Sequence, residues 1–250
     1  MQKDLIVFDL DGTLAPSKAP MRRDMSKMLA RLLAKKKVAV IGGGSYEQFR
    51  KQFVGNLVVP KELLNNLFLF PTTSTSFYRY ENGDWKKVYR KVLSKAEKKK
   101  IMAAFEAAFK KTGYEHPKKH WGPIIEDRGS QITFSALGQK APIPAKETWN
   151  KNGDVRPKLM KIMQKHLPTF EVRRGGLTSI DVTHKGIDKA YGIRKIDEVL
   201  KVPIKKMVFI GDALYPGGND YAAKRTGVQC IRVNDPNDTK RVIQKILKTP

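Results

Sequence analysis

Several short apolar segments of this 250-residue chain are followed closely by aspartate, asparagine, glycine or proline. The first is DLIVFDL at residues 4–10, and others are VAVIGGG, NLFLFP, KMVFIGD and VQCIRV. Short apolar runs bounded by turn residues are typical of strands buried on both faces of a parallel sheet. Amphipathic helical segments such as RDMSKMLARLLAKKK stand between them. The sequence therefore predicts an α/β fold with a doubly wound parallel-sheet core.

The middle of the chain has a different pattern. YRYENGDWKKVYRKV alternates around Asn82-Gly83, which indicates a hairpin. The pattern predicts two helices, SKAEKKKIMAAFEAAFKKTG, which begins with a capping box, and DVRPKLMKIMQKHL. It predicts strands in SQITFSAL and FEVRRGGLTSIDVTH. We therefore expect residues 82–185 to form an inserted α+β cap domain, and residues 1–81 and 186–250 to form the catalytic core.

Two aspartates, Asp9 and Asp11, follow the first predicted strand with one residue between them. Alternate residues of an extended chain point to the same side, so the two carboxylates should lie close together. Like charges at that separation require a cation or a shared proton. A simple strand-to-turn junction is the alternative interpretation.

The chain has 49 Lys and Arg against 24 Asp and Glu, a net charge of +25. The basic residues are distributed along the whole chain and are not interleaved with aromatic side chains, which argues against a nucleic-acid site and favours a lysine-rich solvated surface. The single cysteine excludes an internal disulfide, and no apolar run reaches the roughly 18 residues of a membrane helix. With no leader ahead of the first strand, we expect a cytoplasmic protein.

The polar residues that follow the predicted core strands should converge. Ligands of open α/β sheets bind beyond the carboxyl ends of the strands. There we expect Asp9 and Asp11, the turn Gly42–Ser45, Lys189, and the segment GDALYPGGND with Asp212 and Asp220. Carboxylates suit Mg²⁺, and glycine N–H groups with a lysine suit a phosphate. This combination predicts phosphoryl transfer.

These motifs, in this order, resemble those of the haloacid dehalogenase superfamily of aspartyl-phosphate enzymes, in the branch with a large α/β cap. RGGLTSIDVTHKGIDK and GDALYPGGND are similar to eukaryotic-type phosphomannomutases and related sucrose-phosphate-phosphatase-like hydrolases. The resemblance covers nearly the whole chain.

The resemblance implies roles for the core residues. Asp9 matches the nucleophile, Asp11 the general acid/base, and Lys189 the phosphate-stabilising lysine, with Lys185 as a less well spaced alternative. Asp212 matches the Mg²⁺ ligand with Asp220 beside it, and Asp9 and the backbone carbonyl of Asp11 complete the metal site in the family.

Three positions depart from the family patterns. Gly42 stands where the superfamily usually has Ser or Thr, so Gly43, Gly44 and Ser45 are the expected phosphate contacts, although Ser45 could equally be a helix N-cap. In the cap, phosphomannomutases have a stretch similar to FRNGMxNxSPxGR, whose two arginines bind the distal phosphate. The corresponding segment here, DRGSQITFSALGQ, matches it at Arg128 and Ser135, but Gln139 replaces the second arginine. Lys18 likewise replaces an arginine. Ser179 and Asp181 match residues that contact sugar hydroxyls, and for Asp181 an ordinary strand-end carboxylate is the alternative.

Three functions remain open on the sequence. The first is a mutase that converts mannose 6-phosphate to mannose 1-phosphate, with a hexose 1,6-bisphosphate as activator. The second is a sugar-phosphate phosphatase that uses water as acceptor at the same site. The third, a nucleic-acid-binding protein with a decayed site, disagrees with the intact motifs. The small-molecule partner is a hexose phosphate, and an edge of the cap could support a homodimer.

Overall fold

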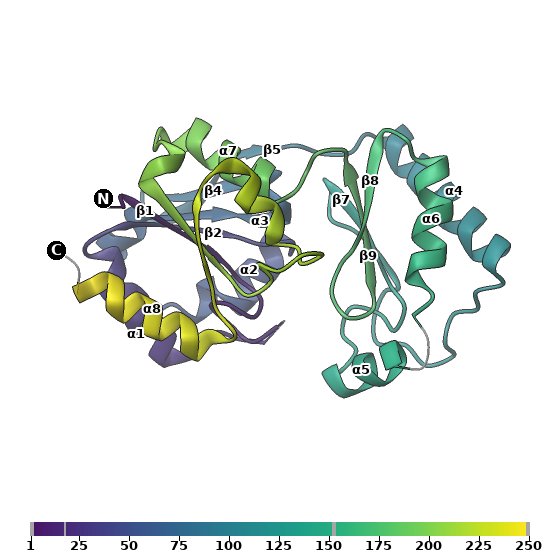
Figure 1. Ribbon diagram of the computed structural model, residues 1–250, viewed down its shortest axis with the longest axis horizontal. Coiled ribbons are helices and arrows are strands. Elements are labelled where there is room, and N and C mark those ends of the chain that lie inside the picture. The colour runs from purple at the N-terminus through teal and green to yellow at the C-terminus, as the bar shows by residue number, and fades with distance from the viewer. Residues whose placement is uncertain (1–2, 18, 152–153, 249–250) are drawn as a thin grey trace. The chain divides into compact units, whose positions relative to one another are not determined.

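The computed structural model describes residues 3–17, 19–151 and 154–248, except for the side chains of residues 150 and 151 (Figure 1). It divides into two compact units, a core unit of residues 1–90 and 187–250 and an inserted unit of residues 91–186. The expected boundary at residue 82 falls earlier than the observed one. The reason is that the hairpin strands β4 (Ser76–Glu81) and β5 (Asp84–Arg90) extend the core sheet, so they do not belong to the insert.

The core unit is built on a seven-stranded sheet in the order β11-β10-β1-β2-β3-β4-β5. The strands β1 (Leu5–Asp9), β2 (Lys37–Ile41), β3 (Leu67–Phe70), β10 (Met207–Gly211) and β11 (Gln229–Arg232) are parallel to their neighbours in this set, while β4 and β5 are antiparallel. All five parallel strands lie where the apolar segments predict them. The predicted sheet is thereby confirmed.

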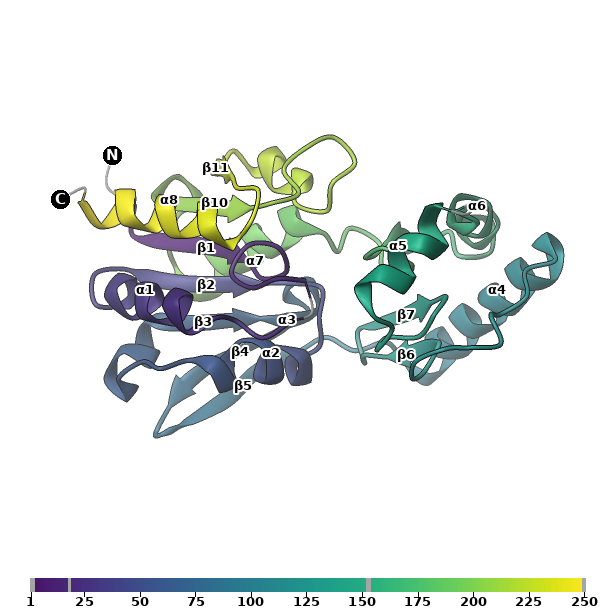
Figure 2. The ribbon, with the colours of Figure 1, turned by 90° about the horizontal axis from the view of Figure 1, so that it is seen from below.

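Helices cover both faces of this sheet, as Figure 2 shows. Alternate strand residues Ile6, Phe8, Val38 and Val40 share one apolar core with the helices α1 (Arg23–Leu33), α2 (Tyr46–Gln52) and α8 (Pro236–Lys248). The intervening residues Leu5, Val7, Ala39 and Ile41 pack with α7 (Lys189–Leu200) on the other face. The strand β1 therefore has apolar partners on both faces and is an interior strand of the sheet.

Short 3-10 helices complete the core unit. They are η1 (Val54–Asn56), η2 (Lys61–Asn66), η3 (Ile204–Lys206) and η4 (Tyr221–Thr226). The last ends at Gly227, which is left-handed with φ +77°.

A left-handed turn follows β3. The four-residue element α3 (Pro71–Ser74) contains Thr72, Thr73 and Ser74 with φ between 47° and 63°. This region of φ/ψ space costs most residues roughly 1–2 kcal/mol. The turn is held because the N–H groups of Thr72 and Thr73 donate to the carbonyls of Gly44 and Gly42, both at 2.8 Å.

Replacing Thr73 with asparagine should relieve part of this strain, because asparagine tolerates the left-handed region better than a β-branched residue. We expect the free energy of unfolding to rise by about 1 kcal/mol in urea denaturation followed by circular dichroism. Thr148→Asn is the control, since Thr148 lies in the right-handed helix α5 (Ile143–Lys151). Equal changes in the free energy of unfolding of the two variants would show that the left-handed backbone at Thr73 is not strained.

The inserted unit has its own antiparallel sheet, in the order β6-β7-β9-β8. Its strands are β6 (Ile125–Asp127), β7 (Gln131–Ser135), β8 (Phe170–Arg174) and β9 (Ser179–His184). One face carries Ile132, Phe134, Ile180 and Val182, which pack against the helices α4 (Lys95–Thr112) and α6 (Arg156–His166). The predicted α+β composition is present, with α5 as a third helix that the sequence pattern does not indicate.

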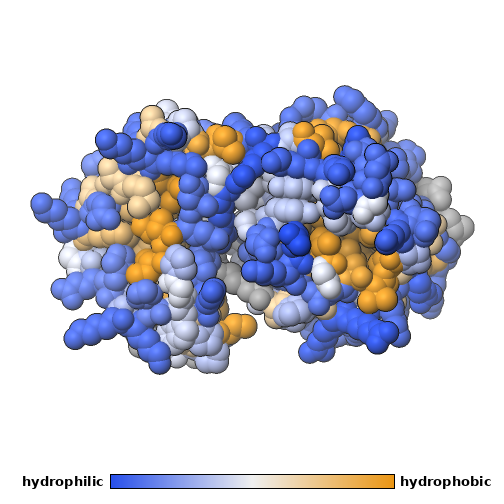
Figure 3. Space-filling view, turned by 180° about the vertical axis from the view of Figure 1, so that it is seen from behind, coloured by the Kyte–Doolittle hydropathy of each residue, from blue (hydrophilic) through white to orange (hydrophobic). Residues whose placement is uncertain are grey.

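Hydrophilic residues cover most of the face in Figure 3, as the net charge of +25 predicts. Hydrophobic residues appear there as separate patches. Across the described ranges, none of the helices combines the length and apolar character that a membrane span requires.

Candidate active site

The carboxyl edge of the core sheet gathers most of the predicted core residues. The parallel strands β1, β2 and β10 end in register at this edge, with Phe8 beside Ile210 and Asp9 beside Ile41. The glycine turn and Asp212 follow β2 and β10 directly, and Asp11 lies two residues after the end of β1. The side chains that the sequence separates by about 200 positions are brought together because parallel strands place equivalent ends at one edge.

Three carboxylates form a cluster at this edge. Asp9, Asp212 and Asp220 each offer one oxygen, and these oxygens lie within 4.8 Å of one another. Asp9 is 3% exposed and Asp220 is fully buried, while Asp212 is half-buried. Burial raises the pKa of Asp9 well above its ordinary value, and burial together with the neighbouring Asp220 charge raises the pKa of Asp212.

Lys189 lies within this cluster and is itself 3% exposed. Its ammonium group forms an ion pair with Asp9, lies 3.0 Å from Oδ1 of Asp220 and donates to the carbonyl of Ile41 at 3.1 Å. Burial alone would lower the pKa of Lys189, but the two carboxylates outweigh it and hold the pKa above its usual value. Lys189 is therefore charged and directed at Asp9.

The N-terminus of α7 fixes the position of Lys189. Asp188 is the N-cap of this helix, and its carboxylate accepts a hydrogen bond from the N–H of Tyr191 at 2.9 Å. The same carboxylate pairs with Arg225. Lys185, the alternative lysine, is exposed and belongs to the inserted unit, so the described contacts favour Lys189 as the lysine of this cluster.

The donor set of the cluster fits a divalent cation. Three carboxylates and one ammonium group carry a net charge of −2 when all are ionised, and such a charge is costly in a buried site. Carboxylate oxygens are hard ligands of the kind that Mg²⁺ prefers. The side chain of Asp11 is not one of the three clustered carboxylates, and the metal contact expected of its backbone carbonyl stays a prediction.

The Asp11-Gly12-Thr13 segment packs against Asp212. Gly12 is left-handed with φ +83°, and a Cβ atom there would lie 2.6 Å from Oδ2 of Asp212. The hydroxyl of Thr13 donates to Oδ1 of Asp212 at 3.3 Å. The glycine is thus needed both for its backbone conformation and for the close approach of a carboxylate.

The glycine turn after β2 lies beside the cluster and is held by the left-handed Thr72–Ser74 turn. A Cβ atom at Gly43 would meet nothing within 4 Å, so there is room next to this backbone. The hydroxyl of Ser45 accepts a hydrogen bond from the N–H of Gln48 at 3.3 Å, which makes Ser45 the N-cap of α2. This contact bears out the N-cap interpretation, and a phosphate contact by Ser45 stays a prediction.

The carboxylate of Asp11 contacts two glutamines of α2 that the sequence analysis does not single out. Gln52 donates to Oδ1 at 2.8 Å, and Gln48 donates to Oδ2 at 3.3 Å. Their spacing of four residues places them on one face of the helix. That spacing is the only sequence signal that could have found them, and glutamine pairs of this kind are common on exposed helices.

The inserted unit joins four of the predicted substrate residues in one hydrogen-bonded chain. Arg128 donates to Oε1 of Gln139 at 3.2 Å, and Nε2 of Gln139 donates to the hydroxyl of Ser135 at 2.8 Å. The hydroxyls of Ser135 and Ser179 lie 2.9 Å apart. These side chains come from β7, β9 and the adjoining loops. Lys18, another candidate, lies outside the described residues.

Asp181 lies on the same sheet and accepts a hydrogen bond from Thr133 at 2.7 Å. Gly175 packs closely against it, because a Cβ atom at Gly175 would lie 2.9 Å from Oδ2 of Asp181. Asp181 is therefore an oriented carboxylate within the β7–β9 pair, and its contact with sugar stays a prediction.

Lys146 is a further cation of the inserted unit that the sequence analysis does not single out. It is 7% exposed, and its ammonium group donates to the backbone carbonyl of Gln139 at 3.4 Å. A buried lysine beside the position that lacks an arginine would supply positive charge there. In the sequence it stands among many surface lysines, so nothing distinguishes it.

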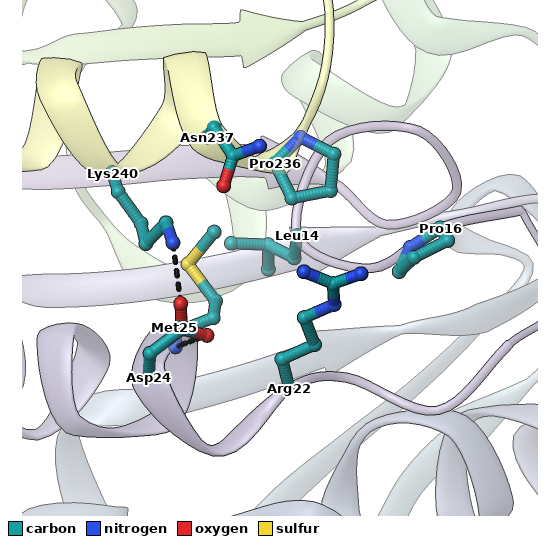
Figure 4. A pocket seen from close by; sticks show the side chains of 8 residues that line it. All are labelled: Leu14, Pro16, Arg22, Asp24, Met25, Pro236, Asn237 and Lys240. Carbon is teal, nitrogen blue, oxygen red and sulfur yellow. Dashed lines mark hydrogen bonds and ion pairs between the residues drawn. The ribbon is translucent and has the colours of Figure 1, made fainter.

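A small pocket borders the segment that follows Asp11 (Figure 4). Its volume is about 80 Å³, and Figure 4 shows Arg22 directed between Leu14 and Pro16. An ion pair between Lys240 and Asp24 closes the other side. The three clustered carboxylates do not line it, so this pocket is distinct from the candidate active site.

Comparison with known structures supports the fold. The chain matches an N-terminally truncated Plasmodium falciparum IMP-nucleotidase with a TM-score of 0.72 at 19% identity, over 100% of this chain and 71% of that one. It also matches a haloacid dehalogenase-like hydrolase from Bacteroides thetaiotaomicron with a TM-score of 0.62 at 15% identity, over 98% and 100% of the two chains. At these identities the likeness concerns the fold alone, and it agrees with the predicted α/β architecture.

Comparison with protein sequences is more specific. The chain is 30% identical over 255 residues to a phosphomannomutase of Encephalitozoon cuniculi, covering 99% of this chain and 94% of that protein. It is 26% identical over 252 residues to a phosphomannomutase of Saccharomyces cerevisiae, covering 97% and 93%. The family model described as eukaryotic phosphomannomutase matches residues 25–249. The chain therefore belongs to the eukaryotic phosphomannomutase family.

Proposed function

We propose that this protein is a cytoplasmic, Mg²⁺-dependent enzyme that converts mannose 6-phosphate to mannose 1-phosphate through an aspartyl-phosphate on Asp9. The observation that carries the proposal is the buried cluster of Asp9, Asp212 and Asp220 with the Lys189 ammonium group paired to Asp9. Membership of the phosphomannomutase family supports the sugar phosphate as substrate.

In one half of the reaction, a carboxylate oxygen of Asp9 attacks a phosphorus atom of the bound hexose 1,6-bisphosphate, and the leaving group is a hexose monophosphate. The bond between phosphorus and the leaving oxygen breaks, and Asp11 donates a proton to that oxygen. In the second half, a hydroxyl of the bound sugar attacks the acyl phosphate, Asp11 takes up the hydroxyl proton, and Asp9 is released as a carboxylate. A hexose 1,6-bisphosphate would prime the enzyme by phosphorylating Asp9.

Lys189 would stabilise the charge that develops on the transferred phosphoryl oxygens, since it is cationic and already lies against Asp9. The backbone N–H groups at Gly43, Gly44 and Ser45 would contact the same oxygens, because there is room beside Gly43. Asp9, Asp212, Asp220 and the carbonyl of Asp11 would hold Mg²⁺. When bound, Mg²⁺ would neutralise the repulsion between the clustered carboxylates and an anionic phosphate.

The inserted unit would act as the cap that selects the substrate. Arg128 and Lys146 would bind the phosphate group that is not reacting, together with Gln139 and Ser135, to which Arg128 is linked. Ser179 and Asp181 would contact sugar hydroxyls, and Lys18 is assigned a phosphate contact on the resemblance alone. Burial of the site would exclude water, so that the phosphoryl group returns to sugar.

A sugar-phosphate phosphatase is the second candidate, and Gln139 favours it. A neutral amide at this position cannot form the bidentate grip of an arginine on a phosphate. A bisphosphate intermediate that is held less tightly would give water more access to the aspartyl-phosphate.

Phosphorus NMR with purified protein, Mg²⁺, mannose 1-phosphate and a trace of hexose 1,6-bisphosphate separates the two functions. We expect mannose 6-phosphate to accumulate, in dependence on the bisphosphate and on Mg²⁺. Accumulation of inorganic phosphate alone would establish the phosphatase and refute the mutase. A spectrum that stays unchanged on every tested hexose phosphate would refute both.

Replacing Gln139 with arginine should raise the ratio of mutase to hydrolase flux by about tenfold, because a bidentate arginine–phosphate contact contributes about 1.5 kcal/mol or more. The same NMR series measures both products. Gln164→Arg, on helix α6 of the same unit, adds the same charge at a distance from Gln139. A ratio that is unchanged in Gln139→Arg, or equally raised in Gln164→Arg, would mean that position 139 does not hold the phosphate.

A further inference from the structure

Tyr89, near the end of β5, contacts the left-handed Thr72–Ser74 turn. Its hydroxyl donates to the backbone carbonyl of Ser74 at 2.9 Å. The ring is half-buried beside Phe77, with 5.9 Å between the ring centroids, and the ammonium group of Lys195 on α7 lies 5.4 Å from the centre of the ring. One side chain of the hairpin therefore links β5 to the turn that follows β3.

The turn needs such contacts because its backbone conformation is unfavourable. Thr72, Thr73 and Ser74 are left-handed in succession, with φ between 47° and 63°, although none of them is glycine. The first two N–H groups of the turn donate to the carbonyls of Gly44 and Gly42, and the tyrosine hydroxyl holds the carbonyl of its last residue. An unfavourable backbone conformation persists only where the surrounding structure holds it in this way.

The side chain of Ser74 does not hold the turn. Its hydroxyl is buried, and it has no hydrogen-bond partner among the residues that the structure describes. It lies against Gly192 of α7, where a Cβ atom would come within 2.9 Å of the hydroxyl oxygen and within 2.1 Å of Cδ1 of Ile41. The polar contact described for Ser74 is therefore made by its carbonyl, which is the group that Tyr89 reaches.

Peptide geometry transmits the position of the left-handed turn to the glycine turn. The described peptide bonds are all trans, and in a trans peptide the C=O and N–H groups point in opposite directions. The carbonyls of Gly42 and Gly44 are directed at the left-handed turn. The N–H groups of the same two peptides, which belong to Gly43 and Ser45, are therefore directed away from it. These are two of the three N–H groups that the proposed function assigns to the phosphoryl oxygens.

We propose that Tyr89 is a positioning residue for phosphate binding. Its hydroxyl fixes the left-handed turn, and the turn fixes the peptide planes that direct the N–H groups of Gly43 and Ser45. The inference rests on the proposed function only in taking the glycine turn as a contact of the phosphate. Burial raises the pKa of the Tyr89 hydroxyl above its ordinary value, so this group remains a hydrogen-bond donor at neutral pH.

The Tyr89→Phe variant removes the hydroxyl and keeps the ring. Without the hydroxyl the left-handed turn is held less firmly, and the two peptide planes are free to rotate. We expect the Kd of inorganic phosphate with Mg²⁺, measured by isothermal titration calorimetry, to rise about 5-fold, the usual effect of one hydrogen bond. In two-dimensional amide NMR spectra recorded without phosphate, the signals of Gly43 and Ser45 should shift.

Tyr80→Phe is the matched control, because it removes the same group from the same hairpin. Tyr80 lies in β4, and its ring packs against that of Trp85 with 5.6 Å between the centroids. This variant should leave the Kd of phosphate and both amide signals unchanged.

A third variant tests whether the effect passes through the left-handed turn. Thr73→Asn should relieve part of the strain, so the turn would depend less on outside contacts. Adding Tyr89→Phe in that background should raise the Kd of phosphate by less than about 2-fold.

Three results would overturn the proposal. An unchanged Kd and unchanged amide signals in Tyr89→Phe, with a lower free energy of unfolding, would show that Tyr89 only stabilises the hairpin. Equal effects of Tyr80→Phe would mean that the hairpin as a whole, and not the hydroxyl of Tyr89, is responsible. An undiminished effect in the Thr73→Asn background would show that Tyr89 does not act through the left-handed turn.

The test is separable from the proposed function. Binding of inorganic phosphate needs neither a sugar site nor turnover, so it can be measured in a protein that acts on no tested hexose phosphate. A wild type that turns over hexose phosphates, while its Gly43 and Ser45 amide signals do not respond to phosphate, would refute the role of Tyr89 and leave the proposed function intact. Amide signals of the phosphate-free protein that are unchanged in Tyr89→Phe would refute the role of Tyr89 whatever the activity.

Discussion

Replacing Asp9 with asparagine is expected to abolish turnover of every phosphate ester, with a loss of at least about 10⁴-fold in kcat. The amide of asparagine is a poor nucleophile and cannot form the acyl phosphate. Turnover is measured as phosphate release and by phosphorus NMR. Incubation with labelled hexose bisphosphate should label the wild type and leave Asp9→Asn unlabelled.

The fold of Asp9→Asn should survive, since the amide has nearly the same size as the carboxylate. Circular dichroism and thermal unfolding verify this. Asp84→Asn is a matched control, because Asp84 is exposed in the β5 hairpin and its Oδ1 accepts from the N–H of Trp85, as an asparagine oxygen can. An active Asp9→Asn protein would rule out the covalent mechanism.

Replacing Lys189 with methionine should lower the free energy of unfolding by about 3–5 kcal/mol, the usual effect of removing one partner from a buried ion pair. Asp9 and Asp220 would lose their common cation in a site where both are almost inaccessible to water. Urea denaturation without Mg²⁺ measures the loss. Turnover should fall as well, because the transferred phosphoryl group loses its cationic contact.

Lys195→Met gives the comparison for this prediction. Lys195 lies on the same helix and pairs with Glu198 at 2.7 Å, but this pair is exposed and should contribute about 0–1 kcal/mol. In addition, Lys189→Met combined with Asp220→Asn should recover part of the stability, since it removes one uncompensated charge. Equal stability of the Lys189→Met and Lys195→Met variants would contradict a role for Lys189 in compensating the cluster.

The parallel strands and the core side of the site were predictable because their signals are local. An apolar run followed by Asp or Gly marks a buried strand and its carboxyl end, and the parallel topology then brings Asp9, Lys189, Asp212 and Asp220 together. Their convergence needs only the fold class. This convergence can be predicted without knowing any of the side-chain contacts.

The features that sequence reasoning missed depend on tertiary context. The Asn82-Gly83 turn predicts a hairpin, but the local sequence does not indicate which sheet the hairpin joins. The expected insert, which begins at residue 82, therefore includes β5, whereas β5 belongs to the core sheet. Gln52 and Lys146 are polar residues on amphipathic helices, where burial could not be foreseen among similar exposed residues. The left-handed Thr72–Ser74 turn opposes the local preference of its residues and is held by carbonyls of the glycine turn.

The interior position of β1 in the seven-stranded sheet determines how the core unit should lose activity on heating. Leu5, Ile6, Val7 and Phe8 are at most 1% exposed, and the strand is paired with β10 on one side and β2 on the other. Amide hydrogens of such a strand exchange with solvent only when the whole cooperative unit opens. The nucleophile is attached to the end of this strand, so local fraying cannot displace it. Thermal inactivation should therefore coincide with global unfolding of the core unit.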